Sequence, residues 1–175
     1  SAAGKAIRQA YPTALKEMLA KDDWHFARKS MALALYSDPE EAFNPSWFYA
    51  YHQPSNMVEF LKIDLGRTSV LKAEWELWDG EEPATNGLIL TNVVDAIGRY
   101  TFLQSEGRFP AWFGKVIGFA VGEIITPALV PGDYAKRVAW IREQLRLALN
   151  AAKVQNFNSG RPFGVPSSEA EDERA

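Results

Sequence analysis

Apolar positions along this chain recur mainly at intervals of three and four residues, the spacing that places side chains on one face of an α-helix. The longest such stripe predicts a helix that begins at residues 131–133 and carries lysines and arginines on its other side. The apolar positions of this helix are Tyr134, Val138, Ile141, Leu145, Ala148, Leu149 and Ala152. A second apolar stretch, after Pro110, predicts a helix over residues 111–126.

Helical spacing also predicts elements in the first part of the chain. Pro12 suits the first turn of a helix over residues 13–21. Acidic residues at 22 and 23 suit the start of a second helix, which residues 37–39 should end. Its apolar positions are Trp24, Ala27, Met31, Ala34 and Leu35. A further helix is expected from about 86 to 104, with Leu90, Val93, Val94, Ile97 and Tyr100 facing inward. Among all these positions, we expect Trp24 and Val138 in particular to be buried.

Residues 57–78 fit two patterns. Apolar residues alternate with charged ones on both sides of Gly66-Arg67, which describes a β-hairpin and is slightly favoured by the pattern alone. The same residues describe a helix face with two charged interruptions, and Gly66 would cost that helix roughly 1 kcal/mol relative to alanine. The positions of that face are Phe60, Ile63, Arg67, Val70, Leu71, Glu74 and Trp78.

Glycines at positions 114, 118 and 122 fall on one stripe of the predicted helix over 111–126. In lipid, such spacing marks helix association. Here it favours close backbone approach to a neighbouring helix or to a partner.

Aromatic residues are abundant, with six Trp, six Tyr and ten Phe in 175 residues of which 47% are hydrophobic. The length fits one domain with a real core, and the aromatic surface exceeds what a small core needs. Some aromatic residues should therefore face a partner. The turn-rich stretch 43–54 supplies the candidates Trp47, Tyr49, Tyr51 and His52.

Charge is segregated although the net charge is only −3. Residues 1–30 hold six Lys/Arg and three Asp/Glu, whereas residues 38–90 hold three Lys/Arg and ten Asp/Glu. The last helix is basic again, and Arg142 and Arg146 are its candidates for docking on an acidic protein surface. A solvated helix face explains such a charge run more often than docking does. Nucleic acid is disfavoured because no zinc spacing, aromatic RNA-binding motif or strongly basic balance is present.

Catalytic and cofactor motifs are missing from the sequence. There is no cysteine, which excludes disulfides and thiolate sites. No nucleophile elbow, phosphate loop or dinucleotide fingerprint occurs, so we expect no enzyme and no directly bound cofactor. His25, beside acidic residues 22 and 23, suits a helix position better than a metal site, which needs three or four converging ligands. The longest apolar run, 116–130, is too short to span a membrane and contains a glutamate and a proline.

The C-terminal residues form a separate part of the predicted organisation. We expect one domain over residues 1–155, followed by an extended tail over 156–175 that ends in an acidic stretch. A loose terminus is the commoner case. Phe157 and Phe163 are nevertheless candidates for lying on a partner.

Three stretches, in this order, carry a resemblance to a known family. Trp47 is followed thirteen residues later by the run 60–65, Leu90-Thr91 leads to Ile97 and Tyr100, and Tyr134, Val138, Ile141 and Leu145 follow at intervals of four, three and four. Over residues 45–155 the chain thereby resembles the PsbQ-type extrinsic subunits of photosystem II, in particular the algal PsbQ′ branch.

The resemblance implies an all-α fold, an up-and-down four-helix bundle with an extra N-terminal helix and an inserted helix over 111–126. It also favours the helix over the hairpin for residues 57–78. The implied function is an extrinsic subunit that stabilises the oxygen-evolving complex and helps to retain calcium and chloride without binding them itself. It would lie in the chloroplast thylakoid lumen, on photosystem II core subunits and other extrinsic subunits, peripheral to the membrane.

Two alternatives stay open. A lumenal PsbQ-like subunit of the chloroplast NDH complex would share the bundle and the location but bind a different partner. A bacterial or viral helical protein-interaction module, unrelated to photosynthesis, would show the same helical patterning.

Overall fold

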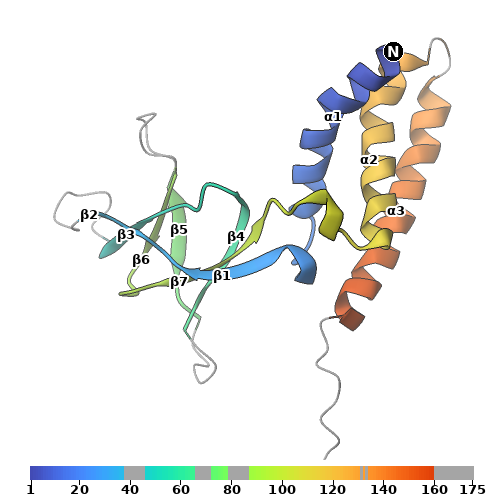
Figure 1. The fold of residues 1–175 in the computed structure, drawn as a ribbon. Coiled ribbons are helices and arrows are strands. Elements are labelled where there is room, and N and C mark those ends of the chain that lie inside the picture. Colours follow the sequence, from blue (N-terminus) through green and yellow to red (C-terminus); the bar gives the residue numbers. More distant parts are fainter. Residues whose placement is uncertain (38–45, 66–71, 79–86, 131, 133, 160–175) are drawn as a thin grey trace, which may run out of the picture. The chain divides into compact units, whose positions relative to one another are not determined.

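The computed structural model describes residues 1–37, 46–65, 72–78, 87–130, 132 and 134–159. The chain forms two compact units. The helical unit comprises Ser1–Met18 and Phe109–Ala175, and the β unit comprises Leu19–Arg108 (Figure 1). The β unit is therefore inserted in the sequence between the first helix and the last two.

The helical unit contains α1 (Ala2–Leu19), α2 (Ala111–Leu129) and α3 (Tyr134–Ser159). The last two pack against each other over much of their length. The inward face of α2 is formed by Phe113, Val116, Ile117, Ala120, Val121 and Thr126. From α3, the buried side chains Val138, Leu145 and Ala152 recur every seven residues, which returns them to nearly the same face of a helix.

The β unit contains seven described strands. These are β1 (Arg28–Ala32), β2 (Leu35–Ser37), β3 (Tyr49–His52), β4 (Met57–Asp64), β5 (Trp75–Trp78), β6 (Leu88–Thr91) and β7 (Ile97–Phe102). One sheet has the order β1-β7-β4 and the other β2-β3-β6-β5, with every neighbouring pair antiparallel. Two short 3-10 helices, η1 (His25–Ala27) and η2 (Glu106–Arg108), complete the unit.

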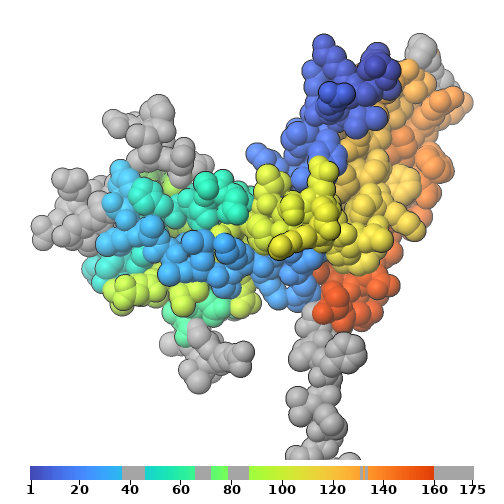
Figure 2. All heavy atoms as spheres, in the orientation of Figure 1, coloured from blue at the N-terminus to red at the C-terminus, as the bar shows by residue number. Residues whose placement is uncertain are grey.

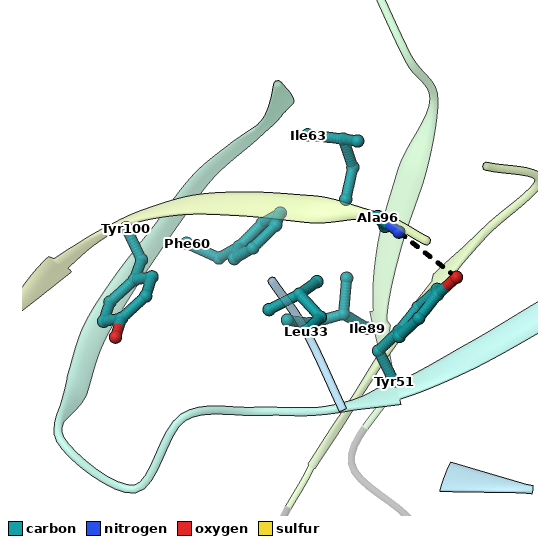
Figure 3. Packing of buried hydrophobic residues seen from close by; sticks show 7 residues of the cluster. All are labelled: Leu33, Tyr51, Phe60, Ile63, Ile89, Ala96 and Tyr100. Carbon is teal, nitrogen blue, oxygen red and sulfur yellow. Dashed lines mark hydrogen bonds between the residues drawn. The ribbon is translucent and has the colours of Figure 1, made fainter. Parts of the chain in front are cut away.

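The main core of the β unit draws on strands of both sheets (Figure 3). Its buried members are Leu33, Tyr51, Phe60, Ile63, Ile89, Ala96 and Tyr100. The Tyr51 hydroxyl donates to the Val93 carbonyl at 2.9 Å and accepts from the Ala96 N–H at 3.3 Å. The buried hydroxyl is thus satisfied as both donor and acceptor, which offsets the cost of removing it from water.

The predicted all-α four-helix bundle is wrong, because the described residues form a mixed α/β fold with two antiparallel sheets. Where the structure describes the predicted helix over 57–78, it has the strands β4 and β5 instead, and Gly66-Arg67 lies outside the described residues. These strands do not form the alternative hairpin either, since β4 pairs with β7 in one sheet and β5 pairs with β6 in the other. The predicted helix over 22–36 is replaced by η1, β1 and β2, and the one over 86–104 by β6 and β7.

Two features of the sheets explain why the sequence pattern of these strands predicted helices. The register of β4 shifts between Phe60 and Lys62, and such a bulge lets Phe60 and Ile63 both face the core at the i, i+3 spacing of a helix. All four residues of β6 are buried. Ile89 lies on one face of the sheet, in the main core. Leu88 and Leu90 lie on the other face, where aromatic side chains cover them, so the strand lacks the usual apolar–polar alternation.

Other predictions are confirmed. Helices occupy 111–126 and the predicted last helix, and both Trp24 and Val138 are buried. Helix α3 continues to Ser159, beyond the predicted boundary at residue 155. The first helix does not begin at Pro12 as predicted, since α1 starts at Ala2 and runs through that proline.

The glycine stripe of α2 does not serve close approach to a neighbouring helix, which was one of the two roles predicted for it. A Cβ added at Gly114 or Gly118 would meet nothing within 4 Å. One added at Gly122 would reach Ile141 of α3 only at an ordinary contact distance of 3.9 Å. The first two glycines therefore leave an open strip on the helix.

Candidate protein-binding surface

The predicted aromatic site at residues 47–52 is divided between the two faces of a sheet. Tyr49 and Tyr51 point toward the main core of the β unit, and Tyr51 is buried. His52 and Trp47 lie on the other side, where the His52 ring meets Tyr36 edge-on at 5.1 Å. Successive residues of a strand point to opposite faces, so this cluster in sequence is not a cluster in space.

Trp47 has a structural role on the outer face. With Tyr36 and Trp78 it covers the buried residues Ala50, Leu88 and Leu90. Its indole Nε1–H donates to the Glu76 carboxylate at 2.9 Å. These contacts account for Trp47 without a partner.

The predicted arginines Arg142 and Arg146 are exposed on α3 and form ion pairs within the helical unit. Arg142 Nε lies 2.6 Å from the Glu123 carboxylate on α2, and Arg146 contacts Glu143 one turn back at 2.7 and 2.9 Å. The hydrogen bond from Arg146 lowers the pKa of Glu143, and the same bond raises the pKa of Arg146. Pairs so exposed contribute little to stability.

The structure describes one of the two phenylalanines that were predicted to bind a partner. Phe157 lies in the last turn of α3 and is exposed. Phe163 lies outside the described residues.

A second apolar stripe on α3 was missed at the sequence level. Trp140, Leu147 and Val154 recur every seven residues, parallel to the buried stripe at 138, 145 and 152, but they are 60%, 47% and 59% exposed. Large apolar side chains gathered on one face mark a binding surface more often than scattered ones do. The seven-residue spacing can be seen in the sequence. The sequence does not show which of the two stripes faces outward.

Two hollows lie beside this stripe, between α2 and α3. The larger has a volume of about 740 Å³ and is lined by Lys115, Gly118, Phe119, Gln144, Leu147, Ala148 and Ala151. The smaller, about 380 Å³, is lined by Thr126, Val130, Lys136, Arg137, Trp140 and Ile141. The rings of Phe119 and Trp140, one from each hollow, meet edge-on at 6.4 Å. We call the two hollows together the α2–α3 groove; both helices are exposed side by side in Figure 2.

The composition of the groove suits a protein ligand. Most of its lining is apolar, and the open strip at Gly118 allows another chain to approach the backbone of α2. The charged side chains among its described lining are all cationic, namely Lys115, Lys136 and Arg137. An apolar surface edged by cations is complementary to an apolar segment with acidic residues.

The charge of the whole helical unit has the same sign. Its sequence, residues 1–18 and 109–175, contains eleven Lys/Arg and eight Asp/Glu. The sequence of the β unit, residues 19–108, instead contains eight Lys/Arg and fourteen Asp/Glu. The two units of one chain therefore carry opposite net charge.

The described residues form no group of three or more His, Cys, Asp or Glu side chains that could hold a metal ion. His25 Nδ1 lies 2.6 Å from Arg28 Nη2. Since a guanidinium can only donate, this nitrogen accepts a hydrogen bond and its lone pair is not directed at a metal.

Within the part of the chain that the structure describes, α2 is the one helix long and apolar enough to cross a membrane by length and composition. Length and composition alone are weak evidence for a membrane span, because a mostly buried helix of a globular core also meets this criterion, whereas 33% of the α2 stretch is buried.

No known protein family matches this chain, and no curated protein is significantly similar to it in sequence.

Proposed function

We propose that this protein is a non-catalytic structural subunit that assembles with further copies of itself through the α2–α3 groove. The observation that carries the proposal is the exposed stripe of Trp140, Leu147 and Val154 beside two hollows. Burying one such side chain is worth roughly 1.5–3 kcal/mol. A partner that covers all three would therefore gain substantial binding energy.

A second copy is favoured as the occupant by charge. The cationic groove of one molecule is complementary to the acidic β unit of another. The β unit also exposes apolar side chains that such an interface would cover, among them Leu35, Phe48 and Val94. An interface between two different surfaces of the same chain is heterologous, so it continues from copy to copy until a ring closes or a filament grows.

Sedimentation velocity over a range of protein concentrations tests the proposal. The wild type should form species larger than a dimer, and the double variant Leu147→Glu, Val154→Glu should remain monomeric. Asn150→Glu is a matched control because it adds a negative charge to an exposed position of α3 outside the groove lining. A wild type that is monomeric at all concentrations, or assembly equal in the wild type and the double variant, would refute the proposal.

Raising the salt concentration provides a second readout. Screening of exposed charges shortens the Debye length from about 10 Å at 0.1 M to about 3 Å at 1 M. Assembly should weaken but persist at 1 M salt, because the apolar part of the interface is not screened. A different outcome is that the wild type binds neutral lipid vesicles and the double variant does not. That result would show that a membrane, and not a second copy, covers the stripe.

The role at photosystem II stays a prediction. It depended on a resemblance that placed residues 60–65 and 90–100 in helices, and these residues lie in β4, β6 and β7 or between them. Release of the protein from photosystem II by concentrated salt, followed by greater dependence of oxygen evolution on calcium and chloride, remains its direct test. The alternative of a protein-interaction module agrees better with the exposed groove.

A further inference from the structure

We infer that one end of the β unit of a second copy enters the α2–α3 groove, namely Phe48 and the loop of residues 92–96, which we call the Val94 loop. This inference rests on the proposed function, because it names the surface that the groove binds. Phe48 and Val94 are 65% and 60% exposed, more than any other large apolar side chain described in the β unit. Exposed apolar side chains that lie together mark a surface that a partner covers.

Phe48 and the Val94 loop lie at the same end of one sheet. Tyr49, the first residue of β3, pairs with Thr91, the last residue of β6, so the chain before β3 and the chain after β6 leave the sheet side by side. The Asn92 side chain joins the two segments. Its Oδ1 accepts a hydrogen bond from the Phe48 N–H at 2.9 Å, and its Nδ2 donates to the Ser46 carbonyl at 3.3 Å.

The Val94 loop is held in one conformation by the core of the β unit. The Tyr51 hydroxyl donates to the Val93 carbonyl and accepts from the Ala96 N–H, the second of which is drawn in Figure 3. The Ala96 carbonyl in turn accepts from the Leu33 N–H at 2.9 Å. A loop that is already ordered in the free protein loses little conformational entropy when it binds.

The tip of the loop presents an apolar side chain next to a carboxylate. Val93 and Ala96 pack on the main core, whereas Val94 and Asp95 between them are exposed. Asp95 has a φ of 50°, in the left-handed region that aspartate adopts more readily than most residues. This turn directs the tip away from the core while both of its ends stay attached.

The groove offers the matching chemistry. Trp140 lines the smaller hollow together with Arg137, and Leu147 lines the larger one together with Lys115. All four side chains are exposed. Each hollow therefore combines an apolar surface with a cation, as the tip of the loop combines an apolar side chain with an anion.

The charge at this end of the β unit is negative. Among the described residues 46–48, 72–74 and 91–96, the charged side chains are Lys72, Glu74 and Asp95. Glu74 belongs to the same end because its carbonyl accepts from the Thr91 hydroxyl at 2.8 Å. Of the two carboxylates, that of Asp95 directly follows Val94, so it is the one expected beside a cation of the groove.

Asp95→Asn tests this charge contact without disturbing the turn, since asparagine also adopts the left-handed region readily. The variant should need a several-fold higher concentration than the wild type to assemble at 0.1 M salt. At 1 M salt the difference should nearly vanish, because the contact is then screened in the wild type as well. Equal assembly of the two proteins at 0.1 M salt would contradict the position given to Asp95.

Mixing two variants tests the whole inference, because a heterologous interface uses a different surface of each copy. The loop variant Phe48→Ser, Val94→Ser keeps its groove, and the groove variant Leu147→Glu, Val154→Glu keeps its loop. In sedimentation velocity each should be monomeric alone. An equimolar mixture should form a dimer of one copy of each and nothing larger.

Leu103→Ser is the matched control for the loop variant. Leu103 is an exposed leucine that follows β7, at the end of that strand away from the Val94 loop. It should assemble like the wild type, whereas the loop variant should need a concentration about tenfold higher or more, since two apolar side chains no longer reach the groove.

The outcomes separate this inference from the proposed function. Wild-type assembly by the loop variant, or a mixture of the two variants that stays monomeric, would overturn the inference. If the groove variant is monomeric in the same measurements, the proposed function stands without it. Wild-type assembly by the groove variant, or a wild type that never assembles, would refute the proposed function and the inference together.

Discussion

The two units of this chain use their apolar residues differently. In the β unit, aromatic side chains cover both faces of the β2-β3-β6-β5 sheet, so Leu88, Ile89 and Leu90 are all buried. In the helical unit, α3 carries two parallel apolar stripes and buries only one of them. The difference indicates that side chains of the β unit itself cover the central strand β6 on both faces, whereas α3 leaves one of its two apolar stripes for something else to cover.

The largest contrast should appear between two neighbouring leucines of α3. Leu145→Asp places a charge at a buried position and should destabilise the helical unit by several kcal/mol. Leu147→Asp, on the exposed stripe, should leave the free energy of unfolding within about 0.5 kcal/mol of the wild type. Urea denaturation of dilute monomer measures both. Comparable losses of stability would show that the second stripe is part of the core.

Tyr51→Phe should weaken the core of the β unit by about 1–3 kcal/mol, because the Val93 carbonyl and the Ala96 N–H both lose their contact with the hydroxyl. Tyr49→Phe is the matched control, since Tyr49 is only partly buried beside the same core. Hydrogen exchange measured by mass spectrometry should localise the lost protection to the β unit. Equal effects of the two variants would argue against a special role of the Tyr51 hydroxyl.

Glycine-to-alanine substitutions should have opposite signs in the two units. At Gly98 the new Cβ would lie 2.8 Å from the buried side chains of Leu33 and Phe60, so the variant should be less stable by about 1–3 kcal/mol. At Gly118 it would meet nothing within 4 Å, and alanine should stabilise α2 by about 0.5–1 kcal/mol. Thermal unfolding of the two variants checks the signs. Destabilisation by Gly118→Ala would mean that the strip on α2 is already in contact.

The smallest effect is expected at the exposed ion pair of Glu143 and Arg146. The pKa of Glu143 is lowered in the folded protein, so the pair stabilises above the unfolded pKa of the carboxyl group and is lost as the pH falls through the folded pKa. Arg146→Gln should move the Glu143 pKa back toward its usual value, which carboxyl-carbon NMR would detect. The melting temperature at pH 7 should hardly change, because water screens both groups. A large fall would show that the pair is coupled to the core.

Helices α2 and α3 were predictable because each has an uninterrupted periodic pattern longer than three turns. Val138 was correctly expected to be buried for the same reason. Trp24 is also buried as expected, but it directly precedes η1, so the helical stripe from which its burial was predicted is wrong. The strands were not predictable in this way. In β4, a bulge places Phe60 and Ile63 on the core side at a spacing that is typical of a helix. In β6, both faces are buried, so apolar and polar residues do not alternate along the strand.

The candidate binding surface was likewise predictable only in part. The heptad of Trp140, Leu147 and Val154 is visible in the sequence, as is the one of Val138, Leu145 and Ala152. A sequence pattern determines which residues share a helix face, because the helical repeat is a local property of the backbone. Which face is buried depends on where α2 lies, and which residues pair across the sheets depends on contacts between distant parts of the chain, so only the tertiary structure decided these.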